Sequence, residues 1–160
     1  MEISLKLYDG KHEGKILRYI VSFFYTHHSQ IDDAQARENL ANWTGEDHEF
    51  FYIIGDGEPV GFLHLNMRGP TVCWIEDIFV DEHLRKQGIA SKAIGLVEEM
   101  LQKRNVTGIC MDVAPDNLPA LRLYHHLGYD RLNIVTVRKD FQPFETARTE
   151  KICGMEFRIK

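Results

Sequence analysis

The segment Arg85-Lys86-Gln87-Gly88-Ile89-Ala90-Ser91 combines residue types and spacing that suit the binding of a large anion. It falls between a predicted strand and the first turn of a predicted helix, where unpaired N–H groups and the helix dipole attract phosphate oxygens. Gly88 allows close approach of the backbone, Ala90 avoids crowding, and Arg85 and Lys86 add mobile positive charge. A glycine at a helix start is also an ordinary turn residue, so the predicted phosphate site depends on this strand-loop-helix setting.

The segment does not match the two common nucleotide-binding loops. The Gly-x4-Gly-Lys-Ser/Thr pattern of a Walker A loop is absent, and so is the GxGxxG dinucleotide fingerprint. The ligands of those two loops are therefore not expected here.

The elements that position this segment are predicted from hydrophobic periodicity and turn residues. Strand 72–80 is apolar on both faces, which indicates a central place in a sheet. Asn117 is a good N-cap, Pro119 is tolerated in the first helical turn, and Gly128 ends that helix. Strands are predicted over 2–8, 50–54, 60–65, 72–80, 107–113, 132–137 and 152–159, and helices over 11–27, 32–43, 117–127 and a segment that begins at Gly88. The order β-α-α-β-β-β-α-β-α-β-β predicts one α/β domain over residues 1–160.

Composition argues against several classes of function. The chain of 160 residues carries 19 basic and 24 acidic side chains, a formal charge of -5, and has no basic run that could follow a nucleic-acid backbone. No apolar run approaches the roughly 20 residues that span a bilayer. We therefore expect a soluble, cytoplasmic protein with neither nucleic-acid nor membrane partners.

Metal and disulfide chemistry is not expected either. Cys73, Cys110 and Cys153 are odd in number and lack a CxxC pair, which predicts small buried residues of a reduced compartment. The histidines considered as ligands lack the spacing and flanking carboxylate of a recognised metal site. These histidines are His27, His28, His64, His125 and His126.

Two blocks of the sequence are similar to one protein family. Arg85, Gly88 and Ala90 fit a signature of Arg or Gln, two residues, Gly, one residue, then Gly or Ala. The segment from Asn117 to Tyr129 is similar to a second block of the same family, with its Asn, its Tyr and a closing Leu-Gly-Tyr. The chain thus resembles the GNAT superfamily of acetyl-CoA dependent N-acetyltransferases. The resemblance implies an α+β fold with a mixed, mostly antiparallel sheet flanked by helices, splayed near Val80 where acetyl-CoA enters.

The strand Trp74-Ile75-Glu76-Asp77-Ile78-Phe79-Val80 is particularly similar to a strand of the spermidine/spermine acetyltransferases. This likeness implies that Glu76 is a general base. It also implies that the backbone from Ile78 to Val80 pairs with the pantetheine amides of the cofactor. It further makes Asn117 a cofactor contact in addition to an N-cap. The small residues at the helix start separately predict that the amides from Gln87 to Ser91 bind the pyrophosphate of the cofactor.

The implied reaction explains why these residue types are needed. An amine with a pKa of about 10.4 is nucleophilic in only roughly one molecule in 2,500 at pH 7, so a base such as Glu76, acting directly or through water, must remove a proton. Tyr124 would protonate the departing thiolate, since its hydroxyl, with a pKa of about 10 against about 8.5 for a thiol, still carries its proton at neutral pH. The alternatives are a solvated or Lys-paired strand carboxylate for Glu76 and a half-buried packing role for Tyr124. Asp77, which points to the opposite face in a regular strand, is expected to be structural.

The expected acceptor is an amine of a small, cationic molecule of polyamine or aminoglycoside type, attacked directly without an acyl-enzyme. Asp32 and Asp33, together with Glu38, lie where the superfamily lines its acceptor cleft. The helix dipole also favours acidic residues at a helix start, so a purely structural reading stands beside this one.

Other readings stay open at this point. Phe141, Phe144 and Glu145 border either the acceptor or a homodimer interface. Two further functions are acetylation of a protein or peptide amine, and a non-catalytic acyl-CoA binding module. Both need the same anion-binding segment, so the segment alone does not separate them.

Overall fold

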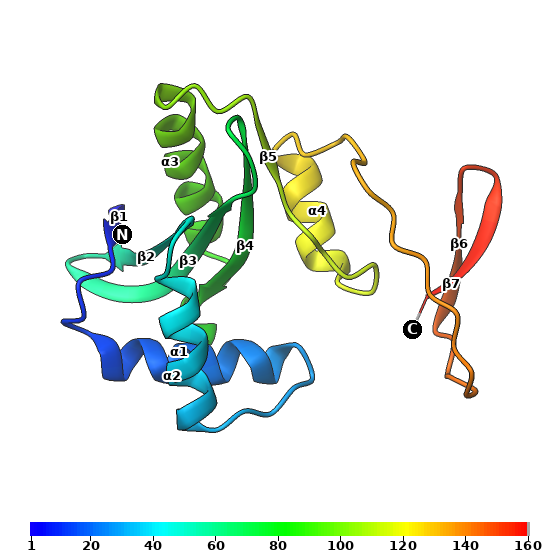
Figure 1. Ribbon diagram of the computed structural model, residues 1–160, viewed down its shortest axis with the longest axis horizontal. Coiled ribbons are helices and arrows are strands. Elements are labelled where there is room, and N and C mark those ends of the chain that lie inside the picture. Colours follow the sequence, from blue (N-terminus) through cyan, green and yellow to red (C-terminus); the bar gives the residue numbers. More distant parts are fainter. Residues whose placement is uncertain (160) are drawn as a thin grey trace. The chain divides into compact units, whose positions relative to one another are not determined.

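The computed structural model describes residues 1–159, which divide into two compact units at Asp112 (Figure 1). The second unit begins at Val113. The elements of the first unit are β1 (Ile3–Leu7), α1 (Glu13–Thr26), α2 (Asp33–Trp43), β2 (His48–Gly55), β3 (Glu58–Met67), β4 (Val72–Val80), the short 3-10 helix η1 (Glu82–Leu84), α3 (Ile89–Lys103) and β5 (Gly108–Cys110). The single domain predicted over residues 1–160 requires the two units to pack against each other, so it stays a prediction.

The strands of the first unit form one sheet in the order β1-β2-β3-β4-β5. Neighbouring strands are antiparallel except β4 and β5, which run parallel and pair from Val72 with Gly108 to Trp74 with Cys110. Because β5 ends at Cys110, no other strand of residues 1–112 pairs with this side of β4 after Trp74. The edge of β4 from residue 75 to residue 80 is therefore open within this unit.

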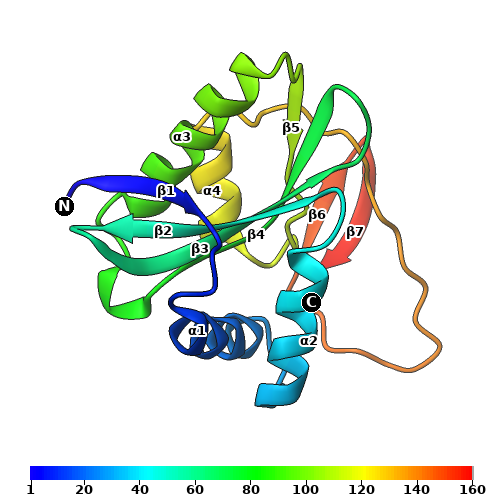
Figure 2. The same ribbon diagram turned by 60° about the vertical axis from the view of Figure 1, so that its left-hand side comes forward.

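Helices cover both faces of this sheet (Figure 2). On one face, α1 contacts β3 and α2 contacts β2, and on the other face α3 contacts β1 and β4. The first face has an aromatic core in which Phe62 stacks on Phe50 and on Phe79, three rings from three adjacent strands. The helices add apolar side chains from every third or fourth position, as their amphipathic sequences predict. The buried residues are Ile16, Leu17, Tyr19 and Ile20 from α1, Ala36 and Leu40 from α2, and Ile89, Ala93, Ile94, Val97 and Leu101 from α3.

One irregularity interrupts the pairing of β3 with β4. His64 pairs with Asp77, but the next residue, Leu65, pairs with Ile75, so Glu76 is an extra residue on β4. Such a β-bulge leaves two residues of one strand opposite one residue of its partner and re-aims their side chains. The bulge lies directly after the point where β5 stops pairing with β4.

The second unit contains α4 (Leu118–His126), a long connection, and a hairpin of β6 (Arg148–Ile152) and β7 (Met155–Ile159). The two strands are antiparallel, and Ile152 pairs with Met155 across the turn. Both turn residues, Cys153 and Gly154, have positive φ, of 51° and 81°. Positive φ at both central positions is the geometry of the type I′ turn that closes two-residue hairpins.

The observed order of helices and strands confirms the predicted order, but the last two strands differ from those predicted. Residues 132–137 form no strand, and Leu132, Ile134, Val135 and Val137 are all exposed. Residues 152–159 are not one strand, because the turn at Cys153 and Gly154 folds them back onto β6. The predicted strand 107–113 is confined to Gly108–Cys110.

The three cysteines are free thiols, and they are not all buried. Cys73 lies in the core, and burial raises its pKa to about 11. Cys110 is half-buried and Cys153 is exposed in the hairpin turn, which corrects the prediction of three buried residues. Within residues 1–159, no helix combines the length and apolar character that crossing a membrane requires.

Candidate active site

The start of α3 has the features of an anion site. It lacks the two side-chain groups that usually occupy such a position, a polar N-cap and an acidic residue in the first turn. Gly88 occupies the N-cap with φ of 77° and provides no side-chain cap, and the first turn contains no acidic residue. The N-termini of two other helices are capped by side chains instead, α2 by Asp32 and α4 by Asn117. Lys86 also has positive φ, of 61°. Turns of this kind direct successive N–H groups toward one point and form concave anion sites.

Arg85 is fixed in place beside this helix start. Its Nε donates to the carbonyl oxygen of Val80 at 3.0 Å, and its guanidinium lies over the ring of Phe79 at 5.3 Å from the ring centre. The expectation of mobile charge at Arg85 is therefore wrong, because its orientation is set by β4. The guanidinium has five N–H donors, and this contact uses one of them.

The open edge of β4 leads from the same helix start toward the bulge. Ile78, Phe79 and Val80 pair with Leu63, Phe62 and Gly61 of β3. On the opposite edge, every second residue of a strand directs its N–H and C=O away from that partner. An extended amide-containing ligand could add to such an edge as a strand does.

Glu76, at the bulge, is held by three donors. Its Oε1 accepts from Asn66 Nδ2 at 2.9 Å, from Arg68 Nε at 2.9 Å and from a terminal nitrogen of Arg68 at 2.5 Å. Arg68 in turn lies over the ring of Trp74, 4.8 Å from its centre. Glu76 is thus neither the solvated nor the Lys-paired carboxylate considered from the sequence, since its partner is an arginine.

Asp77, beside it, belongs to a second hydrogen-bonded chain. Its Oδ2 lies 2.7 Å from Nδ1 of His64, whose Nε2 lies 2.8 Å from Nδ1 of His48. His64 and Asn66, the partners of Asp77 and Glu76, are two residues apart on β3 and so share one face of the sheet. The expectation that Asp77 points to the opposite face from Glu76 is therefore wrong, because the bulge changes the alternation of β4.

The second unit holds Tyr124 near the end of α4. Tyr124 is half-buried, its ring contacts that of Tyr129 at 6.3 Å between centres, and burial raises the pKa of its hydroxyl above the ordinary 10.0. Such a hydroxyl stays protonated at neutral pH and is available as a donor. Asn117 caps the same helix, because its Oδ1 accepts from the N–H of Ala120 at 3.3 Å. The predicted N-cap is confirmed.

The acidic residues at the start of α2 also have a structural task. Asp32 Oδ1 accepts from the N–H of Gln35 at 2.8 Å, and Gln35 Oε1 accepts from the N–H of Asp32 at 3.0 Å. This reciprocal pair is a capping box, which accounts for Asp32 without a ligand. Asp33 is exposed in the first turn of the helix.

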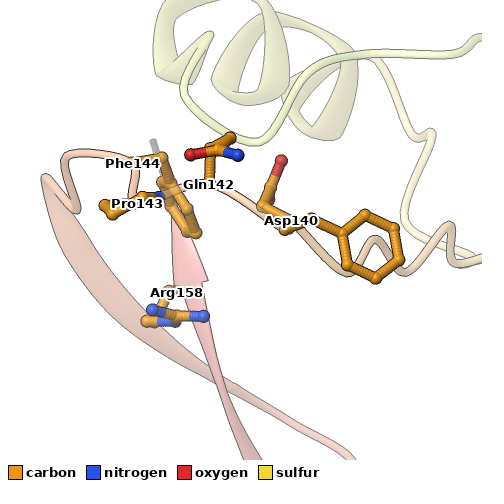
Figure 3. A pocket seen from close by; sticks show the side chains of 6 residues that line it. Asp140, Gln142, Pro143, Phe144 and Arg158 are labelled. Carbon is orange, nitrogen blue, oxygen red and sulfur yellow. The ribbon is translucent and has the colours of Figure 1, made fainter.

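A cavity of about 340 Å³ lies in the second unit, between the long connection and β7 (Figure 3). The guanidinium of Arg158 lies 4.7 Å from the centre of the Phe144 ring. Phe141, on the cavity wall, is 88% exposed. The remaining wall is formed by Asp140, Gln142 and Pro143. Two of the residues expected to border an acceptor or an interface, Phe141 and Phe144, thus line one cavity.

Within the first unit the structure brings together most of the residues that the sequence singled out. Arg85, Gly88 and the open edge of β4 are continuous along the chain, and Glu76 marks the far end of that edge. Sequence reasoning missed Asn66, Arg68 and the link from Asp77 to two histidines. No local signal marks that link, because it joins three strands and depends on their register.

Comparisons with known proteins agree with this fold and identify a family. The model of the acetyltransferase (GNAT) family matches residues 9–129, a stretch that includes β4, the start of α3 and Tyr124. Aminoglycoside N-acetyltransferase AAC(6')-Iy, solved in complex with CoA, has a similar fold with a TM-score of 0.71. The two share 17% identity over 88% of this chain and 96% of that one.

Curated relatives are distant and differ in what they acetylate. Streptothricin acetyltransferase of Escherichia coli is 30% identical over 52% of this chain and 48% of its own length. The [ribosomal protein bS18]-alanine N-acetyltransferase of Escherichia coli K12 is 24% identical over 73% of this chain and 76% of its own length. An uncharacterized N-acetyltransferase of Methanocaldococcus jannaschii is 29% identical over 56% of this chain. The match spans only 42% of that archaeal protein. These relatives do not single out the spermidine acetyltransferases.

Proposed function

The chain belongs to the acetyltransferase (GNAT) family, and we propose that it transfers an acetyl group from acetyl-CoA to an amine of a small cationic molecule. The cofactor binds with its pyrophosphate at the amides from Gln87 to Ser91. Its pantetheine arm pairs with the open edge of β4 at Ile78 to Val80, so that the thioester lies near Glu76.

One observation carries this proposal: the uncapped start of α3 is continuous with the open edge of β4. A ligand with an anionic group at one end and amides along its length satisfies both features at once. CoA has this combination. Arg85, held by Val80 and Phe79, directs its remaining donors without a large loss of side-chain entropy.

The chemistry needs a proton acceptor for the ammonium and a proton donor for the thiolate. A carboxylate of the β4 bulge supplies the acceptor, and Glu76 is the residue that the sequence names for this step. Tyr124 supplies the donor. Because its pKa is raised, transfer to a fully formed thiolate is uphill, so Tyr124 acts while the C–S bond is breaking and sulfur is gaining charge.

A small cationic acceptor is supported by the streptothricin and aminoglycoside relatives and by the acidic residues at the bulge. Polyamines belong to the same class, as the likeness of the 74–80 strand suggests. The ribosomal-protein relative supports a second candidate, the N-terminal amine of a protein. Asp33, which is exposed and has no capping role, is the first candidate for a contact with the acceptor.

Acetyl-CoA dependent thiol release across a panel of amines tests the proposal. Polyamines, aminoglycosides, streptothricin-like amines and a peptide with a free N-terminal alanine form the panel. Turnover with the small polycations is expected. Turnover restricted to the peptide would favour the second candidate, and CoA binding without turnover on any amine would favour a binding module.

The cofactor site has its own test in Gly88→Asp. A carboxylate at this N-cap repels the pyrophosphate, and its side chain occupies the site, so we expect calorimetry to show CoA affinity reduced about 10-fold or more. Gly57→Asp is the matched control, because Gly57 also has a positive φ, of 88°, and open space around it, but lies in the turn between β2 and β3. Undiminished CoA affinity in Gly88→Asp would remove the site from the start of α3.

A further inference from the structure

We propose that Asp77 is the carboxylate that takes the proton from the acceptor amine, and that His64 and His48 are positioning residues that hold it for this task. The inference rests on the proposed function and assigns one of its steps. The three residues to which it assigns new roles all belong to the first unit.

The three side chains form a continuous row across three adjacent strands. Asp77 is on β4, His64 on β3 and His48 at the first residue of β2. The hydrogen bonds joining them measure 2.7 Å and 2.8 Å. His64 is only 2% exposed, and the Trp43 ring from α2 stacks on it at 5.1 Å between centres. A buried imidazole held on both nitrogens and on one face has a fixed orientation.

The row also fixes which nitrogen of His64 carries its proton. A neutral imidazole donates from one nitrogen and accepts at the other. The Asp77 carboxylate can only accept, so His64 donates Nδ1–H to Oδ2, and its Nε2 then accepts Nδ1–H of His48. Setting a tautomer through the second ring nitrogen is a common way for proteins to orient an active histidine.

The two carboxylates at the bulge differ in the hydrogen bonds that they accept. Glu76 receives all three of its donors at Oε1, two of them from a guanidinium, and is bound into an ion pair. Asp77 receives one donor, at Oδ2, and no hydrogen bond within residues 1–159 engages its Oδ1. Asp77 therefore retains an oxygen that can accept a proton, at the point where the edge of β4 becomes open. A carboxylate that served only to satisfy His64 would not require the further link to half-buried His48.

The ionisable groups nearest to the row are an ion pair and a histidine. Glu76 and Arg68 form the neighbouring ion pair, and His27, the C-cap of α1, stacks on Phe23. Tyr19, Tyr52 and Asp81 lie farther along the same face. Phe23 contacts Trp43, which is the residue of α2 that covers His64. The groups that can set the pH dependence of this site are thus His48, His64, Asp77 and the Glu76–Arg68 pair.

The proton balance of the step closes. The ammonium loses one proton to Asp77 Oδ1, and the nitrogen lone pair forms the C–N bond with the thioester carbon. The C–S bond then breaks, and the thiolate receives the second proton of the nitrogen through Tyr124. Asp77 releases its proton to water. The sum is ammonium plus acetyl-CoA giving amide, CoA thiol and one proton.

Two isosteric variants at adjacent positions test the assignment. Asp77→Asn keeps an oxygen that accepts from His64 but removes the proton acceptor, so kcat should fall by about 100-fold or more and the acidic limb of the kcat/KM profile should disappear. Glu76→Gln should instead raise KM for a polycationic amine and leave that limb in place. Normal turnover in Asp77→Asn, or loss of the limb in Glu76→Gln alone, would overturn the proposal.

His48 provides a pair of variants that separate orientation from mere packing. His48→Ala removes the donor to His64 and should lower kcat about 10-fold to 100-fold, the range for losing an outer partner of an active side chain. His48→Gln keeps an N–H donor and should restore most of that activity. Equal activity of the two variants would show that the donor has no role.

A magnetic resonance measurement keeps the test independent of the acceptor. The short bond from His64 Nδ1–H should give a resolved downfield proton signal that is weakened in Asp77→Asn and in His48→Ala. Absence of that signal from the wild-type protein would contradict the arrangement itself. Wild-type protein that acetylates no amine would contradict the proposed function, whereas active wild type with unchanged Asp77→Asn would contradict only this inference.

Discussion

The two units of the chain differ sharply in packing. Residues 1–112 bury side chains on both faces of a five-stranded sheet, with aromatic rings stacked across three strands. Among residues 113–159 only Ile159 is buried, and several large apolar side chains are exposed. Regular structure in this part is limited to α4 and one hairpin.

This difference separates the tasks of the proposed reaction. The cofactor edge, the anion site and the bulge carboxylates all belong to the well-packed unit, where preorganisation is obtained from the core. The proposed acid, Tyr124, stands on a short helix of the sparsely packed unit. We therefore expect that substitutions in the core of the first unit act through stability and those at the start of α3 through cofactor binding, whereas Tyr124, like the proposed base of the bulge, acts on the rate.

The largest expected effect comes from Tyr124→Phe. Loss of the hydroxyl removes general acid catalysis, so kcat should fall about 100-fold to 10,000-fold while CoA affinity and thermal unfolding change little. Single-turnover acetyl transfer, CoA titration and thermal melts measure the three quantities. Tyr25→Phe removes a hydroxyl from an exposed ring and should leave all three unchanged. Wild-type transfer rates in a folded Tyr124→Phe protein would leave the thiolate proton to water.

The next effect concerns stability. Phe62 is fully buried between the rings of Phe50 and Phe79, so Phe62→Ala should lower the free energy of unfolding by about 3 to 5 kcal/mol. Denaturant titration at neutral pH measures this loss as a shift of the unfolding midpoint.

The same substitution in the other unit gives the smallest effect. Phe141→Ala changes an exposed ring and should alter the free energy of unfolding by no more than about 0.5 kcal/mol. A loss comparable to that of Phe62→Ala would show that Phe141 is buried in the working protein, for example against an acceptor or a second copy. The difference in packing between the two units would then be smaller in the working protein.

The sequence predicted the first unit well, because its elements are marked by strong local patterns. The predicted strand 72–80 coincides with β4, and the helix predicted over 32–43 differs from α2 by one residue. The strand predicted over 132–137 failed because alternation of apolar residues gives a propensity, whereas a strand also requires a partner. The turn at Cys153 and Gly154 was missed because Asn-Gly and Asp-Gly are the usual signals for this geometry.

The candidate site was predictable only where its residues are close in sequence. The proposed anion site at Gly88 follows from seven consecutive residues, and the structure places Gly88 at the N-cap of α3. The row from Asp77 to His48 joins residues 29 positions apart and exists only in one strand register. The same is true of the Glu76–Arg68 pair, which needs the turn between β3 and β4 to close. The sequence alone does not show how two strands are aligned or which residues a turn brings together.

The bulge at Glu76 makes the site depend on the number of residues in β4. In a regular strand the parity of a residue number decides the face on which its side chain lies. The extra residue reverses parity partway along β4, so Trp74 and Asp77, an even and an odd number, both serve the face covered by α2. A single deletion between them would restore ordinary parity and move either the ligand edge or the carboxylates to the wrong side. Insertions and deletions in this strand are therefore far more restricted than substitutions, and any relative that preserves the site must preserve the number of residues between Trp74 and Val80.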